Sequence, residues 1–569
     1  MALFDVVGIA SIMPFMAVLA NPQLVNTNSI LNTAFQASSI LGITTANQFL
    51  FALGVGMFFM LLLALGLKAF TAYAQLRFTL LREYSIGKRL IEGYLHQPYV
   101  WFLNRHSADL GKTILSEVSD VVHGGIMPLM TLIAQSAVAL AIMCLLLIVD
   151  PLLTFIVGIA LGLSYIIIFK FVSNYLERIG TEKYEFNRIR FEVVSEAFGA
   201  IQEVKIGGLE QIFIDRFSIA AKNYALRLAS GQAVAQLPRF ALEAISFGGM
   251  IILVLVLMTR DGDFSRTFPI IVLYAFAGYR LMPALQQIYS SFSQLRFAGR
   301  GIDALHKDLI SIRGVHQGTA ANSRMLLQGA IELKEVIFSY PGSSKQALQS
   351  INITIPSKST IGLVGATGSG KTTVVNLILG LLEPHEGCLI VDGLVINSSN
   401  RRQWQKAIGY VPQQIYLSDD SVAANIAFGV EEQNINYEAV ERAAKIANLH
   451  ELIITDLPSG YDTKVGERGI RLSGGQRQRI GIARALYHNP FVLFLDEATS
   501  ALDGLTEKVV MEAINNLGRD MTIILIAHRL STVRQCDQIY LLDGGRVKAQ
   551  GTYEELQKID QQFRKMTSL

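Results

Sequence analysis

The chain of 569 residues carries a formal net charge of +3, and 51% of its residues are hydrophobic. A chain of this length exceeds what one hydrophobic core supports, so we expect at least two domains. The mean hydropathy of +0.38 is high for a soluble protein and predicts a membrane-embedded part. The small net charge argues neither for nor against an anionic partner. The three cysteines, Cys144, Cys388 and Cys536, fit no metal or disulfide spacing and indicate ordinary buried thiols.

Long apolar stretches dominate the first half of the chain. About 20 apolar residues in a helix are enough to cross the hydrocarbon core of a bilayer. Residues 49–67, 128–149 and 152–169 contain no charged residue, 240–258 and 268–289 contain one each, and 2–20 contains Asp5 and Pro14. We therefore predict an all-α transmembrane domain of six helices over residues 1–310.

The placement of lysine and arginine predicts the orientation of these helices. Residues 21–48 carry no charge, whereas 77–112 and 170–227 are rich in both bases. Because basic segments stay in the cytoplasm, we expect both chain ends and everything after the last span there. The two basic segments have helical patterns without apolar spans, so they predict helices that continue beyond the membrane. These helices should turn back at Pro98 and at Gly207-Gly208.

Two features of the N-terminal region leave alternatives open. Residues 28–42 predict a short amphipathic helix, capped by Asn28 or Ser29 and ended by Gly42, with Ile30, Leu31, Ala34, Phe35 and Leu41 on one face. It either lies on the outer surface and guides a lipid tail, or packs on the spans as a connector. The first span begins at Met1 with no basic residue before it, so we expect that the native chain starts upstream or has been shortened.

The second half of the chain has a different pattern. Residues 311–327 are polar and predict a linker. From residue 328 to 569, short β-branched runs such as 331–338, 359–364, 491–495 and 522–526 alternate with helical patterns. That alternation predicts an α/β domain with parallel core strands.

A glycine-rich segment lies between the buried run 361–364 and a helical pattern over 374–382. It consists of Gly365, Ala366, Thr367, Gly368, Ser369, Gly370, Lys371, Thr372 and Thr373. In a strand–loop–helix context the backbone N–H groups of such a P-loop wrap phosphates, Lys371 reaches the outer phosphates, and the Thr372 hydroxyl binds Mg²⁺. The segment therefore predicts a site for a nucleoside triphosphate with Mg²⁺.

Further motifs follow the P-loop in a fixed order. The first is Leu472, Ser473, Gly474, Gly475 and Gln476. An apolar run then ends in Asp496 and Glu497, and His528 follows the run 522–526. In this order the motifs resemble the ATP-binding cassette (ABC) family, and the preceding membrane half resembles its exporters. The resemblance implies a type I exporter fold with an α/β P-loop cassette.

The resemblance also implies roles for single residues. Lys371 would bind the phosphates, Asp496 would hold Mg²⁺ through water, Glu497 would polarise the attacking water, and His528 would contact the terminal phosphate. Tyr340 would stack on adenine. Gln413 would join Mg²⁺ and sense the membrane domain. Residues 466–469 and 500–503 resemble loops that contact the membrane half and the partner cassette, and the turns at Pro98 and Gly207 resemble coupling helices.

In this family the segment from Ser473 to Gln476 covers the ATP of a second cassette. One chain supplies one membrane half and one cassette, so the resemblance implies a homodimer, or a dimer with a similar half-transporter. It also implies a multi-pass protein of the bacterial inner membrane with cytoplasmic cassettes.

The cargo has to be argued from the membrane half. Residues 12–15, 237–243 and 278–283 resemble the lipid-linked oligosaccharide flippases of bacterial protein N-glycosylation (PglK type). That similarity implies an amphipathic lipid cargo carrying a pyrophosphate-linked oligosaccharide. The alternatives are a general exporter of hydrophobic drugs or lipids and, more remotely, an ATPase without transport.

Three basic residues near the spans are candidate substrate contacts: Lys68, Arg239 and Arg280. Lys68 also fits a snorkelling lysine, and Arg239 also fits a pair with Glu243 one turn away. Arg280 lies about 18 Å into its span, where an arginine is costly unless it is paired or wet. It predicts either a contact to a pyrophosphate or a structural pair with Asp5.

Overall fold

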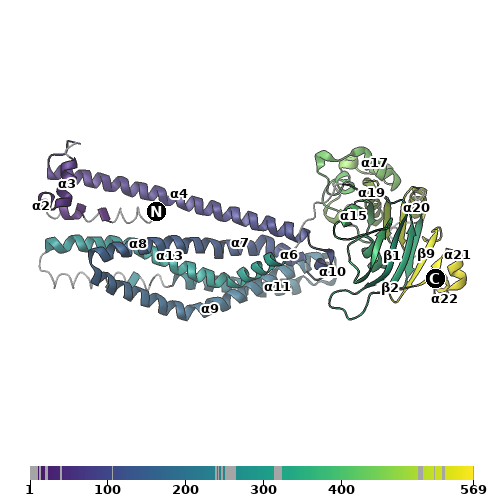
Figure 1. Cartoon of the computed structure of the whole chain (residues 1–569), viewed down its shortest axis with the longest axis horizontal. Helices are drawn as coiled ribbons and strands as arrows, with labels where there is room; N and C mark the ends of the chain where they lie inside the picture. Colours follow the sequence, from purple (N-terminus) through teal and green to yellow (C-terminus); the bar gives the residue numbers. More distant parts are fainter. Residues whose placement is uncertain are drawn as a thin grey trace. The chain divides into compact units, whose positions relative to one another are not determined.

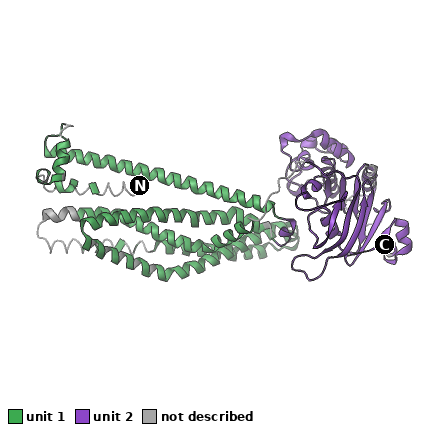
Figure 2. Cartoon of the chain, viewed as in Figure 1, with its two compact units in different colours: residues 1–97, 105–315 green, residues 98–104, 316–569 purple. Residues whose placement is uncertain are grey.

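The computed structural model of the chain forms two compact units (Figures 1 and 2). It describes residues 10–11, 14–19, 23–38, 42–105, 107–237, 240, 243–244, 248–249, 251, 264–312, 323–497, 504–517, 520–527 and 532–567. Unit 1 comprises residues 1–97 and 105–315, and unit 2 comprises residues 98–104 and 316–569.

Unit 1 is helical. The segment before its first long helix contains α2 (Leu24–Thr27) and α3 (Ser29–Ser38). Its long elements are α4 (Ala46–Leu95), α8 (Met127–Val149), α9 (Pro151–Gly199), α11 (Glu210–Gln236) and α13 (Phe264–Ser311). The shorter ones are α6 (Ser107–Lys112), the π-helical turn η2 (Thr113–Glu117), α7 (Val118–Val121), the π-helical turn η3 (Val122–Ile126) and α10 (Ile201–Gly207).

The long helices agree with the predicted spans where the structure describes them. The span 49–67 lies within α4, 128–149 within α8, 152–169 within α9 and 268–289 within α13. Among the described residues, Ala46–Leu95 and Ala108–Val149 are long and apolar enough to cross a membrane. The predicted spans 2–20 and 240–258 lie largely outside the described residues.

The helices also continue and turn as their sequence predicts. α4 runs without a break from the first apolar stretch into the basic segment, and α9 does the same. After α4, the helix α5 (Tyr99–Leu103) starts directly behind Pro98 and belongs to unit 2. After α10, Gly208 takes a left-handed φ of 61° and ends the helix before α11 begins. Both predicted turns are therefore present.

The segment that contains α2 and α3 packs on the long helices. The Asn28 side chain accepts a hydrogen bond from Leu31 N at 3.3 Å, as a cap of α3 does. Leu31 and Phe35 pack on an apolar cluster around Phe49, and the rings of Phe35 and Phe49 meet edge to face at 5.4 Å. The structure therefore favours the connector over a helix whose apolar face is free for a lipid tail.

A close approach of three helices fixes part of unit 1. At Gly180 of α9, an added Cβ would clash with the backbone carbonyl of Phe297 on α13. At Gly231 of α11, an added Cβ would lie 2.7 Å from the Phe297 ring. Phe297 is therefore held between two glycines: a larger residue at Gly180 would require a backbone shift, and one at Gly231 would require the Phe297 ring to move.

Unit 2 contains two sheets (Figure 1). The smaller has the order β2-β1-β4-β5, and the larger has the order β10-β9-β3-β8-β7-β6. The strands are β1 (Ala330–Phe338), β2 (Leu348–Pro356), β3 (Thr360–Gly365), β4 (Glu386–Val391), β5 (Leu394–Val395), β6 (Ile408–Val411), β7 (Val492–Asp496), β8 (Thr522–Ile526), β9 (Gln538–Asp543) and β10 (Arg546–Gly551). In the larger sheet β6, β7, β8, β3 and β9 pair in parallel, as the sequence predicts.

The run 331–338 does not follow that pattern. It forms β1, which pairs antiparallel with β2 and β4 in the smaller sheet. Its alternation of buried and exposed residues is the signature of a strand with one solvated face, unlike the fully buried β8.

Unit 2 also contains nine described α-helices besides α5. They are α14 (Lys371–Ile378), α15 (Arg401–Gln405), α16 (Val422–Ile426), α17 (Tyr437–Ile446), α18 (His450–Asp456), α19 (Gly474–Tyr487), α20 (Gly504–Leu517), α21 (Tyr553–Ile559) and α22 (Gln561–Thr567). The 3₁₀ turns are η4 (Glu432–Asn434), η5 (Gly460–Asp462) and η6 (Glu467–Gly469). Two apolar clusters form the core of the unit, and the carboxyl ends of β3, β7 and β8 meet at one edge of the sheet.

Candidate functional site

The glycine-rich segment forms the turn between β3 and α14. Gly370 precedes α14 with φ 104°, a conformation that side chains rarely adopt, and an added Cβ would lie 2.8 Å from Leu348. The Ser369 hydroxyl is buried and makes no hydrogen bond within the described chain. α14 starts at Lys371, so its free N–H groups open toward the loop, which is the arrangement that binds phosphate.

Lys371 is folded into this loop. Its side chain is only 6% exposed, and its Nζ donates to the carbonyl oxygens of Gly365 at 2.7 Å and Ala366 at 3.0 Å. Burial lowers the pKa of Lys371, and the nearby negative charges of Glu497 and Asp496 oppose that shift. The P-loop lysine and the two acids therefore lie in one electrostatic site.

The two acids end strand β7. Asp496 is opposite Ile526 in the register with β8 and accepts a hydrogen bond from the Tyr410 hydroxyl at 3.4 Å. Glu497 follows with φ 49°, and its backbone N–H donates to Ile526 O at 3.1 Å. Such a φ costs a non-glycine residue about 1–3 kcal/mol, and such strain is concentrated at functional sites. Because of this left-handed φ, the Glu497 side chain does not point in the direction that a continued β-strand would give it.

Gln413 lies beside these acids. It follows β6 after Pro412, its side chain is exposed, and its Nε2 donates to Glu497 Oε2 at 2.8 Å. Parallel strands β6 and β7 bring the two residues together across a long sequence separation. The structure thus joins Gln413, Asp496, Glu497 and Lys371 in one place, where the sequence has them in separate motifs.

Tyr340 approaches the same loop from the smaller sheet. It is half-buried, its ring meets Phe338 edge to face at 5.1 Å, and its hydroxyl lies 3.1 Å from Thr373 Oγ1. This position beside the start of α14 is compatible with an aromatic platform for a base.

Ser473 caps α19. Its hydroxyl accepts from Gln476 N at 3.2 Å, while Gln476 Oε1 accepts from Ser473 N at 2.8 Å. This capping box leaves the exposed Ser473 and the glycines Gly474 and Gly475 at a helix N-terminus. A helix start of this kind favours anionic groups.

Some predicted residues lie outside the described part of the chain. These are His528, Arg239, and the loop 500–503. Conversely, sequence reasoning missed Tyr410, which lies next to Asp496. Its signal in the sequence, a tyrosine two residues before Pro412, is too common to single it out.

Of the three basic residues predicted to contact substrate, the structure describes Lys68 and Arg280. Lys68 is exposed on α4, just past the apolar stretch, as a snorkelling lysine is. Arg280 is half-buried on α13 and already has an interaction partner.

Comparisons with known proteins agree with the two halves. Residues 348–500 match the family model of the ABC transporter, and residues 8–284 match that of the ABC transporter transmembrane region. An ATP-dependent lipid A-core flippase of Cupriavidus pinatubonensis is 32% identical over 473 residues, which cover 82% of this chain and 79% of the relative. The mitochondrial ATP-binding cassette sub-family B member 10 of Mus musculus is 34% identical over 80% of this chain and 62% of its own length.

A solved structure extends the similarity to the whole fold. The ATP-bound structure of a bacterial Atm1-family ABC exporter superposes with a TM-score of 0.78 over 99% of this chain and 97% of that chain. At 24% identity this similarity supports the fold.

Proposed function

Because this chain belongs to the ABC exporters, with a transmembrane region fused to an ATP-binding cassette, we propose that it flips an amphipathic lipid across the membrane. It is a membrane protein that binds ATP and couples ATP hydrolysis to transport. Exporters of this half-size type work as dimers. The lipid cargo is supported by the relative named an ATP-dependent lipid A-core flippase, which matches 82% of this chain.

The chemistry is assigned to the group of residues around the P-loop. Lys371 and the backbone from Gly365 to Thr373 bind the phosphates, and Tyr340 supports the base. Glu497 acts as the general base that orients the attacking water, and its contact with Gln413 holds the carboxylate next to the phosphates. His528 is assigned to the terminal phosphate from the family motif alone. Positioning and charge neutralisation account for most of the rate in phosphoryl transfer.

Magnesium fits the donor set at this site. Thr372, Gln413 and Asp496 offer a hydroxyl, an amide oxygen and a carboxylate, the hard oxygen ligands that Mg²⁺ prefers beside the phosphates. The ion would neutralise the phosphate charge. Tyr410 positions the Asp496 carboxylate by its hydrogen bond.

The partner is proposed to be a second copy of this chain. Each cassette has both halves of a composite site, the P-loop with its acids and the capped helix start at Ser473, so two identical chains complete two sites. We place the protein in the bacterial inner membrane with its cassettes in the cytoplasm. In this proposal residues 1–310 form the transmembrane domain, residues 311–327 the linker, and residues 328–569 the ATP-binding cassette domain.

The cargo is proposed more narrowly as a lipid-linked oligosaccharide. Two observations support this narrower cargo. Residues 12–15, 237–243 and 278–283 resemble the PglK-type flippases, and Arg280 is a base that can contact a pyrophosphate. The second candidate is a hydrophobic drug or plain lipid, which is favoured by an apolar cavity of about 410 Å³ between α8, α9 and α13.

The test uses the full chain in liposomes with ATP. Polyprenyl-pyrophosphate oligosaccharide, a lipopolysaccharide precursor lipid and typical hydrophobic drugs are compared for stimulation of ATPase activity and for ATP-dependent movement between leaflets. Stimulation and flipping by either glycolipid support the proposal. Stimulation by the drugs alone would replace it with the second candidate.

A further inference from the structure

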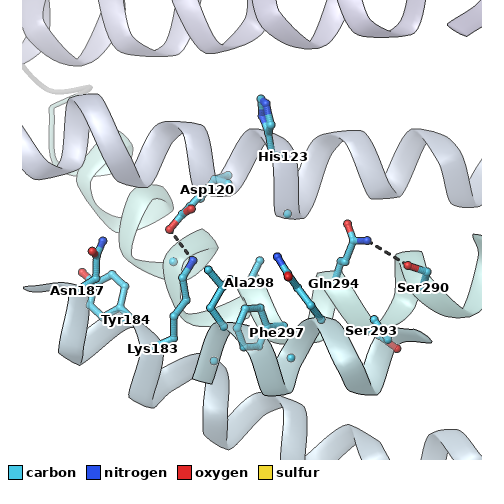
Figure 3. A pocket seen from close by; sticks show the side chains of 18 of the residues that line it. Asp120, His123, Lys183, Tyr184, Asn187, Ser290, Ser293, Gln294, Phe297 and Ala298 are labelled. Carbon is cyan, nitrogen blue, oxygen red and sulfur yellow. Dashed lines mark hydrogen bonds and ion pairs between the residues drawn. The ribbon is translucent and has the colours of Figure 1, made fainter. Parts of the chain in front are cut away.

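Two cavities follow one another along the helices α9 and α13 of unit 1. The first, of about 410 Å³, is lined almost entirely by apolar side chains, among them Met143, Ile166 and Leu285. The second, of about 330 Å³, is lined by both apolar and polar side chains from η2, α7, η3, α9, α11 and α13. Its polar members include Asp120, Lys183 and Gln294 (Figure 3). We call it the polar cavity, because the first contains almost no polar lining. Both volumes fall in the range of small-molecule sites.

The two cavities differ in their depth. With the outer end of α9 at Pro151, Gly158 and Phe169 lie about 10 and 27 Å along the helix, inside a hydrocarbon core of about 30 Å. Gly180 and Asn187 of the second cavity lie about 44 and 54 Å along, beyond the hydrocarbon core on the predicted cytoplasmic side. The apolar cavity is thus at the level of acyl chains, and the polar cavity at the level of headgroups and cytosol.

The boundary between the cavities contains buried hydroxyls. Tyr289 and Ser293, one turn apart on α13, are 3% and 1% exposed. The Tyr289 hydroxyl lies near Ser293, but within the described part of the chain neither of these hydroxyls nor that of Tyr165 makes a hydrogen bond of good geometry. The Tyr165 and Tyr289 rings lie 6.0 Å apart. Buried hydroxyls without such bonds are costly, so this level suits the oxygen atoms at the polar–apolar junction of a lipid.

The charges of the polar cavity are balanced. Lys183 pairs with Asp120 at 2.7 Å (Figure 3). Glu117 pairs with the buried Lys112 at 2.8 Å. The remaining lining is rich in uncharged donors and acceptors, including Gln232 and Gln294, whose Nε2 donates to Ser290 Oγ at 3.1 Å. Carboxamides, hydroxyls and paired ions match sugar hydroxyls better than a bare phosphate, which would require an excess of positive charge.

The backbone at the polar cavity is irregular. The π-helical turns η2 and η3 follow each other within one helix, and Glu117, His123 and Gly124 from these turns line the cavity. π-Helical turns inside α-helices occur frequently at functional sites.

We propose that the bundle of α8, α9, α11 and α13 in a single chain binds a glycolipid from the cytoplasmic leaflet, with its tail between Gly162 and Tyr289 and its sugar between Lys183 and Gln294. The inference rests on the proposed lipid transport and gives it a loading site within one subunit. The sugar, not a phosphate, is the group that the polar cavity selects.

Photolabelling tests the site. The full chain in nanodiscs of phosphatidylethanolamine and phosphatidylglycerol is exposed to a galactosyl-diacylglycerol with a diazirine in one acyl chain, and to the same diacylglycerol without sugar. Peptide mass spectrometry should map adducts to α9 and α13 around the apolar cavity, more strongly with the sugar-bearing probe.

Gly162→Leu adds a bulky side chain at the lining of the apolar cavity, where an added Cβ meets no atom within 4 Å, and should reduce the space for an acyl chain. Labelling should fall about tenfold, which corresponds to about 1.4 kcal/mol. Gly66→Leu on α4, an exposed helical glycine with the same free space, is the matched control and should label as the wild type does. Gly162→Met is a second variant, whose flexible side chain adapts more easily to the surrounding helices. Basal ATPase activity shows whether each variant is folded.

The double variant Gln232→Leu, Gln294→Leu should bring labelling by the sugar-bearing probe down to the level of the sugar-free probe. Equal labelling by both probes in the wild type, or unchanged labelling in both Gly162 variants, would overturn the site. Labelling needs no ATP, so intact labelling without flipping refutes the proposed function and leaves the site. Flipping with no adduct at the cavity refutes the site alone.

Discussion

The hydrogen bond from Gln413 Nε2 to Glu497 Oε2, 2.8 Å long, joins the end of one strand to the carboxylate that follows the next. Glu497 adopts its left-handed φ of 49° at this point, so backbone and side chain together set the direction of its carboxylate. A catalytic base held in this way responds to any movement of the segment after β6.

Removal of the Gln413 amide should slow ATP turnover. A hydrogen bond to a charged group contributes about 1.5–3 kcal/mol, so Gln413→Ala should lower kcat about tenfold or more. Steady-state ATPase assays over a Mg²⁺ titration measure the effect. The neighbouring Gln414 is equally exposed, and Gln414→Ala should hydrolyse ATP at the wild-type rate. Equal rates for the two variants would contradict a role of the bond.

Glu497→Gln should keep the shape of the side chain and remove the base. We expect hydrolysis to fall about a hundredfold or more while ATP still binds and the dimer closes. Lys371→Ala should instead lose ATP binding, because the buried ammonium no longer reaches the phosphates. Nucleotide binding and turnover are measured in parallel. A Glu497→Gln enzyme that hydrolyses ATP at near wild-type rate would refute the assigned mechanism.

Tyr410 predicts a pH effect on stability. Burial, with a contribution from Asp496, raises the pKa of Tyr410 to about 12 from a usual value of 10. The folded state therefore favours the protonated hydroxyl, and this stabilisation is complete below pH 10 and is lost as the pH rises toward 12. Tyr410→Phe should show a shallower loss of thermal stability between these pH values. Parallel stability curves for both proteins would show that the hydroxyl is not coupled to folding.

We expect helix α5 to transmit lipid binding to the ATPase without being required for ATP hydrolysis itself. Val100 packs on the apolar cluster of unit 2 that also contains Leu363 and Val374, on either side of the P-loop. Val100→Asp should abolish stimulation of the ATPase by lipid and leave basal hydrolysis largely intact. Leu103→Asp, at an exposed position on the same helix, is the control. Normal stimulation in the Val100 variant would show that this contact does not transmit substrate binding.

Arg280 predicts an effect on cargo. If its guanidinium contacts a pyrophosphate, Arg280→Ala should abolish flipping of the lipid-linked saccharide and keep basal ATP hydrolysis. Arg280→Lys should retain part of the transport, since lysine lacks the bidentate geometry. Normal transport by both variants would remove this role, as would rescue of Arg280→Ala by Asp5→Asn.

The sequence patterns predict the presence of helices and strands better than they predict the residues at which these elements begin and end. The predicted run 522–526 agrees with β8, because all five of its residues are buried and carry the hydrophobic signal. The helix after the P-loop was expected over 374–382, yet it covers Lys371–Ile378. Its first turn is polar because it opens toward the phosphate site, so apolar periodicity starts one turn late.

The candidate site could be predicted as a set of residues but not as an arrangement. Motif order identified Lys371, Asp496 and Glu497. The bond between Gln413 and Glu497, the Tyr410 hydroxyl beside Asp496 and the left-handed φ of Glu497 depend on strand pairing across many residues. Local patterns contain no information on such contacts, and the same holds for the hydroxyls around Tyr289.

The clamp of Phe297 between Gly180 and Gly231 limits how the membrane unit can change shape. If α9 or α11 moved along α13 by one turn, the Phe297 ring would leave the space next to Gly180 and Gly231. It would then contact a residue larger than glycine. Packed cores resist such continuous shear and switch between discrete arrangements. The parts of α9, α11 and α13 around Phe297 should therefore move together as one rigid body when the membrane unit changes conformation.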